Sequence, residues 1–305
     1  MKKISIRQPL CYSEQGEREN QEDSFYPADP TPDSRVFIVC DGMGGHAKGE
    51  VASRTVCDAL GSYFEKHPLP DKIRTDEEME YAINTAIDAA YDALDAADSG
   101  EEVKKMGTTL TLVCLHRAGC TVAHIGDSRI YQVRPAAEYK LLYQSSDHSL
   151  VNDLVRIGEL TPEEARIDPR RNILTRAMQP HQERRKYAEV HLLKDVQAGD
   201  YFFLCSDGVL EQLTTEKLLE ILSEKATDKE KLEKLKAVCL GKTRDNHTAY
   251  LIPIEQVEGE DDDDTANVGE EVQDDEPVQI IGVENPAPQK RSIWQRIFKF
   301  KRSAP

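Results

Sequence analysis

The feature that most constrains the fold of this chain is an apolar segment that runs directly into an aspartate. Asp41 follows residues 36–40, Val-Phe-Ile-Val-Cys, and is itself followed by Gly42. Asp207 follows a similar segment at residues 201–205. Short apolar runs bounded by turn residues are typical of buried β-strands, so each aspartate is expected where a strand leaves the core. Asp-Gly alone is a common turn dipeptide, but a carboxylate at a strand end can also hold a cation.

Two further aspartates extend this pattern. Asp127 follows the apolar residues 121–125 after one glycine, and Asp245 precedes the β-prone residues 248–252. In an antiparallel sheet the end of one strand lies beside the start of its neighbour, so the four carboxylates are predicted to share one sheet edge. Clustered acids repel one another unless cations lie among them. Oxygen ligands without His or Cys suit Mg²⁺ or Mn²⁺ better than Zn²⁺.

The remaining periodicity predicts antiparallel sheets covered by helices, which is an α+β fold. Apolar residues repeat at helical spacing in 52–64 and in 79–94, and helices are expected again at about 215–239. Residues 145–185 are polar and rich in arginine, and predict an exposed helical insertion. Strands are expected at 108–115, 120–125, 129–133, 187–193, 201–205 and 248–254.

Composition excludes several classes of protein. The seven cysteines are odd in number, form no C-x-x-C pair and lie mostly in apolar segments, which predicts reduced core residues in a cytoplasmic protein. No segment approaches the run of about 20 apolar residues that a transmembrane helix needs, and residues 1–10 lack the apolar part of a secretory signal. The net charge of −17 argues against a nucleic-acid partner.

Six motifs occur in a fixed order between about residues 10 and 254. They are Arg18-Glu19-Asn20-Gln21-Glu22-Asp23, Asp41-Gly42-Met43-Gly44-Gly45, Gly107-Thr108-Thr109, Gly126-Asp127-Ser128-Arg129, Ser206-Asp207-Gly208 and Asp245-Asn246. Together they resemble the motifs of the metal-dependent protein phosphatases, also called type 2C serine/threonine phosphatases, and of their bacterial members in particular. The resemblance implies a four-layer α-β-β-α sandwich of two antiparallel sheets flanked by helices, with a metal site at one end.

The resemblance also implies two Mn²⁺ or Mg²⁺ ions and their main ligands. Asp41 would bridge the two cations, and the carbonyl of Gly42 would bind the second. Asp207 and Asp245 would complete the ligands of the first. Two such ions would hold a water or hydroxide between them for direct attack on phosphorus, so that phosphoserine and phosphothreonine in proteins are hydrolysed without a covalent intermediate.

The remaining roles implied by the resemblance surround this pair of ions. Glu22 and Asp23 would act near the second cation, partly through water. Asp127 resembles the ligand of a third, weaker cation that would be shared with Asp207. Arg18 would grip the phosphate, because a guanidinium can hold two phosphoryl oxygens at once.

Met43 departs from the pattern of many eukaryotic members, which have a histidine there that is proposed as the general acid. Water or another group would then protonate the leaving oxygen. His46 and His148 are interpreted as a helix-start residue and a framework residue, without catalytic roles. The resemblance further implies a monomeric enzyme that acts on phosphorylated proteins and opposes a serine/threonine kinase.

The insertion at about 145–185 resembles the flap of the family, a segment beside the active site. Its arginines are interpreted either as contacts for acidic or phosphorylated substrates or as a solvated helical surface. They are Arg166, Arg170, Arg171, Arg176, Arg184 and Arg185.

Beyond the phosphatase domain, predicted to span 1–254, the composition changes twice. Residues 258–278 are dominated by Asp and Glu, and residues 255–288 are predicted to form a disordered acidic linker. Residues 289–305 are basic and amphipathic, and 289–302 could contact an anionic membrane surface or a partner. The alternatives are disorder or docking onto the acidic surface of the same chain.

Two other functions fit parts of the sequence. Residues 42–47 match the loose dinucleotide pattern G-x-G-x-x-A, but Asp41 would face the pyrophosphate and a second helix follows where a βαβ unit needs a strand. The same fold could also serve as a catalytically inactive regulatory or binding module. Loss of metal carboxylates would mark such a module, and Asp41, Asp207 and Asp245 are all present.

Overall fold

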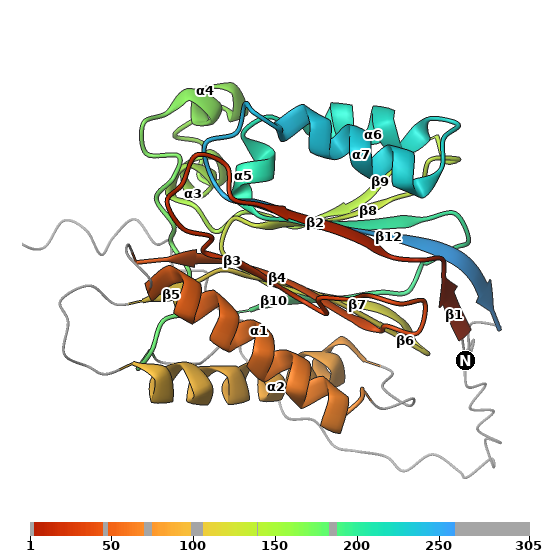
Figure 1. The fold of residues 1–305 in the computed structure, drawn as a ribbon, viewed down its shortest axis with the longest axis horizontal. Helices are drawn as coiled ribbons and strands as arrows, with labels where there is room; N and C mark the ends of the chain where they lie inside the picture. The colour runs from red at the N-terminus through yellow and green to blue at the C-terminus, as the bar shows by residue number, and fades with distance from the viewer. Residues whose placement is uncertain are drawn as a thin grey trace, which may run out of the picture. The chain divides into compact units, whose positions relative to one another are not determined.

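The computed structural model describes residues 3–44, 48–69, 75–98, 106–138, 140–182 and 188–259. In this part of the chain, two antiparallel sheets lie face to face with helices on both outer sides (Figure 1). The helices are α1 (Lys48–Lys66), α2 (Asp76–Ala97), α3 (Leu150–Arg156), α4 (Pro162–Ile167), α5 (Asp207–Leu210), α6 (Thr215–Ser223) and α7 (Asp228–Cys239).

The strands divide between a β4 sheet and a β12 sheet. The β4 sheet has the order β10-β7-β6-β4-β3, with β5 paired to β4. The β12 sheet has the order β1-β12-β11-β8-β9, with β2 paired to β12. The strands are β1 (Lys3–Ile6), β2 (Leu10–Glu14), β3 (Asp23–Tyr26), β4 (Val36–Met43), β5 (Gly107–Thr108), β6 (Leu110–His116), β7 (Gly119–Ile125), β8 (Arg129–Val133), β9 (Leu141–Gln144), β10 (Glu189–Leu193), β11 (Tyr201–Cys205) and β12 (His247–Glu258).

Three apolar layers hold the sandwich together. The first lies between α1, α2 and the β4 sheet and contains Leu60 and Ile83. The second lies between the two sheets and contains Phe37 and Phe202, both fully buried. The third lies between the β12 sheet and helices α6 and α7. Strands buried on both faces read as continuous apolar runs rather than as alternating ones, which explains the apolar segments that precede the aspartates.

Most of the predicted elements are present. The helical periodicity at 52–64 and 79–94 corresponds to α1 and α2, and the strand predicted at 248–254 is β12, which continues to Glu258. The insertion carries two short helices, α3 and α4, joined and followed by irregular segments. Strands β1, β2, β3 and β9 were not predicted, because each is short and mixes polar with apolar residues.

The prediction of one shared sheet edge is wrong. Asp41 belongs to the β4 sheet, whereas Asp207 and Asp245 flank β11 and β12 of the other sheet. Asp127 lies in the turn between β7 and β8, which connects the two sheets. The four aspartates therefore come from both halves of the sandwich, because strand pairing is a tertiary property that the apolar runs do not encode.

Other expectations can be compared with the described residues. All seven cysteines are free, and all except the partly exposed Cys11 are buried. Helix α1 is followed by α2 rather than by a parallel strand, so the dinucleotide-binding alternative finds no βαβ unit there. Within the described part of the chain, no helix is both long and apolar enough to cross a membrane. The acidic linker beyond residue 259, the basic segment 289–305 and His46 lie outside the described residues.

Candidate metal centre

Asp41 lies inside strand β4, and not at its end as predicted from the sequence. The strand continues through Met43, and Asp41 is the direct cross-strand partner of Asp23 in β3. Two threonine hydroxyls also fix the Asp41 backbone. The Asp41 N–H donates to Thr109 Oγ1 at 2.9 Å, and the Asp41 carbonyl accepts from Thr108 Oγ1 at 2.9 Å. This pairing brings the carboxylates of Asp41 and Asp23 together in a fixed backbone frame.

At Gly42 three backbone segments approach one another closely. Its N–H donates to the carbonyl of Glu22 at 3.1 Å. A Cβ atom at this position would lie 2.2 Å from the carbonyl oxygen of Gly49 and 2.6 Å from that of Glu22, so only glycine fits. The Glu22 side chain reaches the same place, since a Cβ on Gly49 would lie 2.9 Å from Glu22 Oε2. Glycine at positions 42 and 49 therefore allows the Gly42 carbonyl and the Glu22 carboxylate to lie close together. Both are predicted to act at the second cation.

Asp207 and Asp245 enter the centre from the β12 sheet. Asp207 is the first residue of α5 and is separated from β11 by Ser206 alone, and Asp245 precedes β12. Asp245 Oδ2 accepts a hydrogen bond from Arg18 Nη2 at 2.6 Å, and the Arg18 side chain is 58% exposed. The predicted phosphate-binding arginine therefore lies at the rim of the carboxylates, with part of its guanidinium open to solvent.

Asp127 is fixed by the turn in which it lies. The next residue, Ser128, shares a hydrogen bond of 2.8 Å with Thr109 through their hydroxyl groups. Thr109 in turn accepts from the N–H of Asp41. The Gly-Asp-Ser-Arg motif and the β4 strand are thus connected through one buried threonine.

The carboxylates influence one another strongly. Burial first, and then the charge of neighbouring carboxylates, raise the pKa of Asp23 to about 7 and the pKa of Asp207 to about 6. Burial and then the Asp207 charge raise the pKa of Asp127 to about 8. The pKa of Asp41 is also raised well above its usual range, by burial and by Asp207, Asp23 and Asp127. These groups are costly to ionise in a protein without bound cations.

The donor atoms of these residues fit hard divalent cations. Oδ1 of Asp23 and Oδ1 of Asp207 are buried and have no hydrogen-bond partner among the described residues. Buried carboxylate oxygens without partners are unfavourable unless a cation or another donor is bound. The candidate ligands are all oxygen atoms, which suits Mn²⁺ or Mg²⁺.

Three polar residues that the sequence analysis gave no role position the candidate ligands. Ser206 Oγ donates to Asp23 Oδ2 at 2.7 Å, across the two sheets. Asn246 Oδ1 accepts from the Glu22 N–H at 2.8 Å, which fixes the segment that carries Glu22 and Asp23. Thr109 is the third residue. Each lies in one of the sequence motifs, and a small polar residue in or beside a buried strand is the signal that could have identified it.

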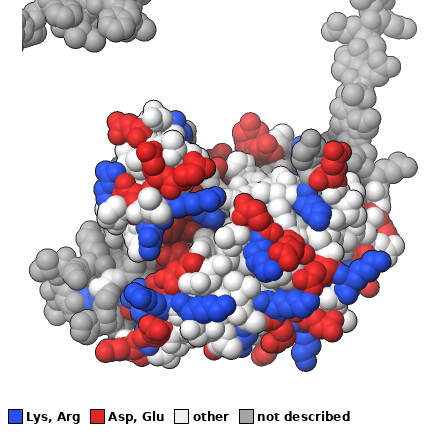
Figure 2. Space-filling view, turned by 90° about the horizontal axis from the view of Figure 1, so that it is seen from above, with Lys and Arg blue, Asp and Glu red and all other residues white. Residues whose placement is uncertain are grey.

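The arginines of the insertion that the structure describes lie on its surface. Arg166, Arg170, Arg171 and Arg176 are exposed, and Arg170 pairs with Asp168 at 2.8 Å. Arg184 and Arg185 lie outside the described residues. The molecular face in Figure 2 carries acidic and basic side chains interspersed over its described area. Such a surface lacks the broad basic patch of a nucleic-acid-binding face.

Residues 12–238 match the family model for protein phosphatase 2C. The chain is 35% identical over 205 residues to the serine/threonine protein phosphatase PstP of Mycobacterium tuberculosis, an alignment that covers 67% of this chain and 36% of PstP. It is 32% identical over 217 residues to the serine/threonine phosphatase stp of Listeria monocytogenes, covering 71% of this chain and 82% of that protein.

A solved structure has the same fold. The catalytic domain of PstP in complex with two manganese ions matches with a TM-score of 0.68 and 31% identity, covering 83% of this chain and 100% of that chain. The predicted α+β sandwich of two antiparallel sheets flanked by helices is confirmed by this likeness and by the strand order.

Proposed function

This chain belongs to the protein phosphatase 2C family, as its motifs predicted, and we propose that it is a metal-dependent protein serine/threonine phosphatase. The observation that carries the proposal is the group of buried carboxylates that meet from both sheets and raise one another's pKa values. Such a group is stable in its ionised form when cations bind among its oxygens. Mn²⁺ or Mg²⁺ are the proposed cofactors, two ions with a third, weaker site at Asp127.

We assign the ligands as the sequence motifs suggested. Asp41 would lie between the two cations, Asp207 and Asp245 would bind the first, and the Gly42 carbonyl with Glu22 would serve the second. Asp23 would act beside this second ion. When bound, the two cations polarise a water for in-line attack on phosphorus and offset charge on the phosphoryl oxygens.

Arg18 is proposed to orient the phosphate. Its guanidinium donates to Asp245 through one nitrogen, and its side chain remains more than half exposed. A guanidinium that is anchored on one edge can still offer its other N–H groups to two phosphoryl oxygens. Met43 has no proton to give, so water or another group must protonate the leaving serine or threonine oxygen.

The test is the release of phosphate from a phosphothreonine peptide by the full chain. We expect release with Mn²⁺, none above background with EDTA, and a loss on the order of a hundredfold or more in Asp207→Asn. Asp153→Asn is the matched control, because among the described residues the Asp153 side chain pairs with the exposed Arg156 of α3, and its change should leave the rate as it is. Activity that persists in both EDTA and Asp207→Asn would overturn the two-cation assignment.

The proposed substrates are phosphorylated proteins, modified by a serine/threonine kinase that this enzyme would oppose as a monomer. The exposed arginines of the insertion, such as Arg171 and Arg176, are proposed to contact acidic or phosphorylated segments of these proteins. Comparing peptides with and without acidic residues beside the phosphothreonine tests this. Equal kcat/KM for both would remove the arginines from substrate recognition.

We also propose that the phosphatase domain, residues 1–254, is followed by an acidic linker at 255–288 and a basic anchor at 289–305 that contacts an anionic membrane surface. The support is the sequence alone, in which cations surround Trp294 and Phe298. Co-sedimentation with anionic vesicles should be lost in a chain ending at Gly259, a cut that keeps β12 whole. Equal sedimentation of the two chains would remove the anchor.

A further inference from the structure

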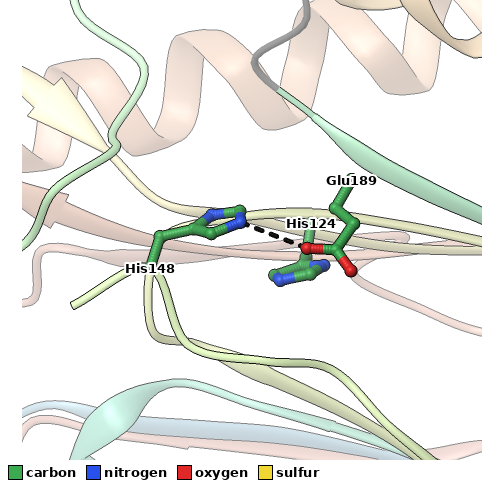
Figure 3. A group of neighbouring side chains, drawn as sticks. All are labelled: His124, His148 and Glu189. Atoms are coloured by element: carbon green, nitrogen blue, oxygen red, sulfur yellow. Dashed lines mark ion pairs between the residues drawn. The ribbon is translucent and has the colours of Figure 1, made fainter. Parts of the chain in front are cut away.

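The buried His124 and His148 and the partly exposed Glu189 form a cluster (Figure 3). One ligand atom from each lies within 4.8 Å of the other two. His124 belongs to β7, its cross-strand partner Glu189 belongs to β10, and His148 lies at the base of the insertion. Nδ1 of His124 and Nε2 of His148 are buried without hydrogen-bond partners among the described residues. The cluster therefore resembles a metal site in composition.

Its geometry does not suit a shared cation. The two imidazole rings are stacked, with centroids 4.6 Å apart and planes inclined by only 10°. A nitrogen lone pair lies in the plane of its ring, and no nearby point lies in both of two almost parallel planes. In addition, His148 Nδ1 accepts a hydrogen bond from the Gly126 N–H at 3.1 Å, so the proton of a neutral ring is on Nε2. The Nε2 atom lies 3.4 Å from Glu189 Oε2.

The contacts of His148 instead converge on Gly126. Nδ1 accepts from the Gly126 N–H, and the backbone N–H of His148 donates to the Gly126 carbonyl at 2.9 Å. The preceding residue, Asp147, binds Arg129 through two hydrogen bonds of 2.6 Å. Residues 147 and 148 therefore hold the turn on both sides of Asp127.

We propose that His148 is a positioning residue, which fixes the Asp127 carboxylate for the weakest cation by holding Gly126 and so connects the insertion to the metal centre. This inference rests on the proposed function, in which Asp127 is a ligand. The same turn carries Ser128, whose hydroxyl is linked through Thr109 to the backbone of Asp41. Displacement of Gly126 would thus disturb both Asp127, the proposed ligand of the third cation, and Asp41, the proposed bridging ligand.

The surroundings of His148 preserve this role. The carbonyl of His148 accepts from the Thr175 N–H at 2.8 Å, which fixes the histidine within the insertion. Burial, the stacked His124 and the charge of Arg176 lower the pKa of His148 to about 4. The ring is neutral at ordinary pH, so Nδ1 keeps the lone pair that accepts the hydrogen bond from the Gly126 N–H.

A matched pair of amide variants separates this role from general packing. In His148→Asn the side-chain oxygen can take the place of Nδ1, whereas in His148→Gln the amide reaches the place of Nε2 instead. Mn²⁺ binding to each folded protein is measured from free Mn²⁺ by electron paramagnetic resonance. We expect His148→Gln to weaken the weakest Mn²⁺ site about tenfold, and His148→Asn to change it by less than about twofold. His191→Gln is the control, since His191 contacts the same Glu189 from within strand β10.

Equal Mn²⁺ affinity of the Asn and Gln variants would overturn the inference while leaving the proposed function intact. A parent chain that neither binds Mn²⁺ nor releases phosphate would instead overturn the proposed function. Nitrogen-15 NMR of the unaltered protein provides a second test that does not depend on the folding of any variant. We expect the proton of His148 on Nε2, and a proton on Nδ1 would refute the contact with Gly126.

Discussion

The carboxylates of Asp23 and Asp41 face each other across β3 and β4, where like charges destabilise a sheet. Asp207 adds a third acid from the other sheet and raises the pKa of both. In the absence of cations, protonation is the means by which these side chains reduce their repulsion. The residues that would bind metal are thus the ones that weaken the cation-free protein.

Asp41→Asn should therefore have opposite effects on stability and on metal binding. The amide keeps the size of the side chain, is neutral without taking up the proton that the raised pKa of Asp41 otherwise demands, and can donate a hydrogen bond to Asp207. We expect the unfolding temperature in EDTA to rise by about 2–4 °C, which corresponds to about 1 kcal/mol. The stabilisation by Mn²⁺ should disappear. Thermal unfolding with and without Mn²⁺ checks both, and a lower unfolding temperature in EDTA would contradict the repulsion.

The cation-free protein should lose stability as the pH rises from about 6.5 to 8. Asp23 and Asp127 have folded pKa values of about 7 and 8, well above the unfolded value of about 3.9, so the native state binds more protons in this window. Stability falls with pH wherever the native state holds the extra protons. Below about 6.5, His116 and His148 oppose this trend, because burial lowers both pKa values to about 4.

Unfolding temperatures measured in EDTA between pH 6.5 and 8 provide the measurement. Asp127→Asn should flatten the upper part of the decline, and saturating Mn²⁺ should abolish it, because bound cations favour the ionised carboxylates. A temperature that rises with pH in EDTA would show that these carboxylates are already ionised at pH 6.5.

Helix α1 illustrates how an element is placed against its sheet. Its buried side contains Val56, Leu60 and Phe64, at the helical spacing that the sequence showed. Gly61 lies against Tyr26 of β3, where a Cβ atom would be 2.5 Å from the ring. The helix and the strand therefore approach more closely than any side chain at position 61 would allow.

Gly61→Ala should destabilise the protein even though alanine favours helices. The gain in helix propensity is about 1 kcal/mol, and overpacking against the partly buried Tyr26 ring costs about 1–3 kcal/mol. We expect a net loss of about 1 kcal/mol in the free energy of unfolding, measured by urea denaturation. Ser62→Ala, at the exposed neighbouring position, is the control and should be neutral or slightly stabilising. Equal stabilisation by both changes would show that Tyr26 moves aside.

Long, regular elements were predictable, whereas short ones were not. Helices α1 and α2 and strands such as β6, β7 and β11 carry a clear apolar period or run over most of their length. Strands β1 and β2 are edge segments that mix polar and apolar residues, and they become strands because β12 offers them a partner. Propensity alone does not reveal such a partner.

The metal end of the molecule is formed by both sheets together. The hydroxyl of Ser206, which follows β11 in the β12 sheet, donates to the carboxylate of Asp23 in the β4 sheet. The side-chain oxygen of Asn246 accepts from the backbone N–H of Glu22. Cations that bind between Asp41 and Asp207 would add further connections between the two sheets. Binding to the folded state alone also stabilises the whole domain by mass action.

Hydrogen exchange tests this connection. Mn²⁺ should slow the exchange of the Thr109 amide, which donates to the Asp41 carbonyl, and of the Thr248 amide, which donates to Ser206 Oγ. Both should slow together, because cations bound by the two sheets oppose the opening of either one. The Ala137 amide, in the turn after β8, should not change. Protection confined to one of the two sheets would contradict a centre shared between them.

The sequence by itself determined the family, the α+β sandwich and the identity of the candidate ligands, because apolar runs that end in Asp are local and the motifs keep their order along the chain. Only the tertiary structure decided that the carboxylates come from two sheets rather than one, that Asp41 lies within a strand opposite Asp23, and that Ser206 and Asn246 hold the ligands in place. The physical reason is that register and sheet pairing depend on contacts between residues far apart in sequence, whereas periodicity reports only which residues are buried.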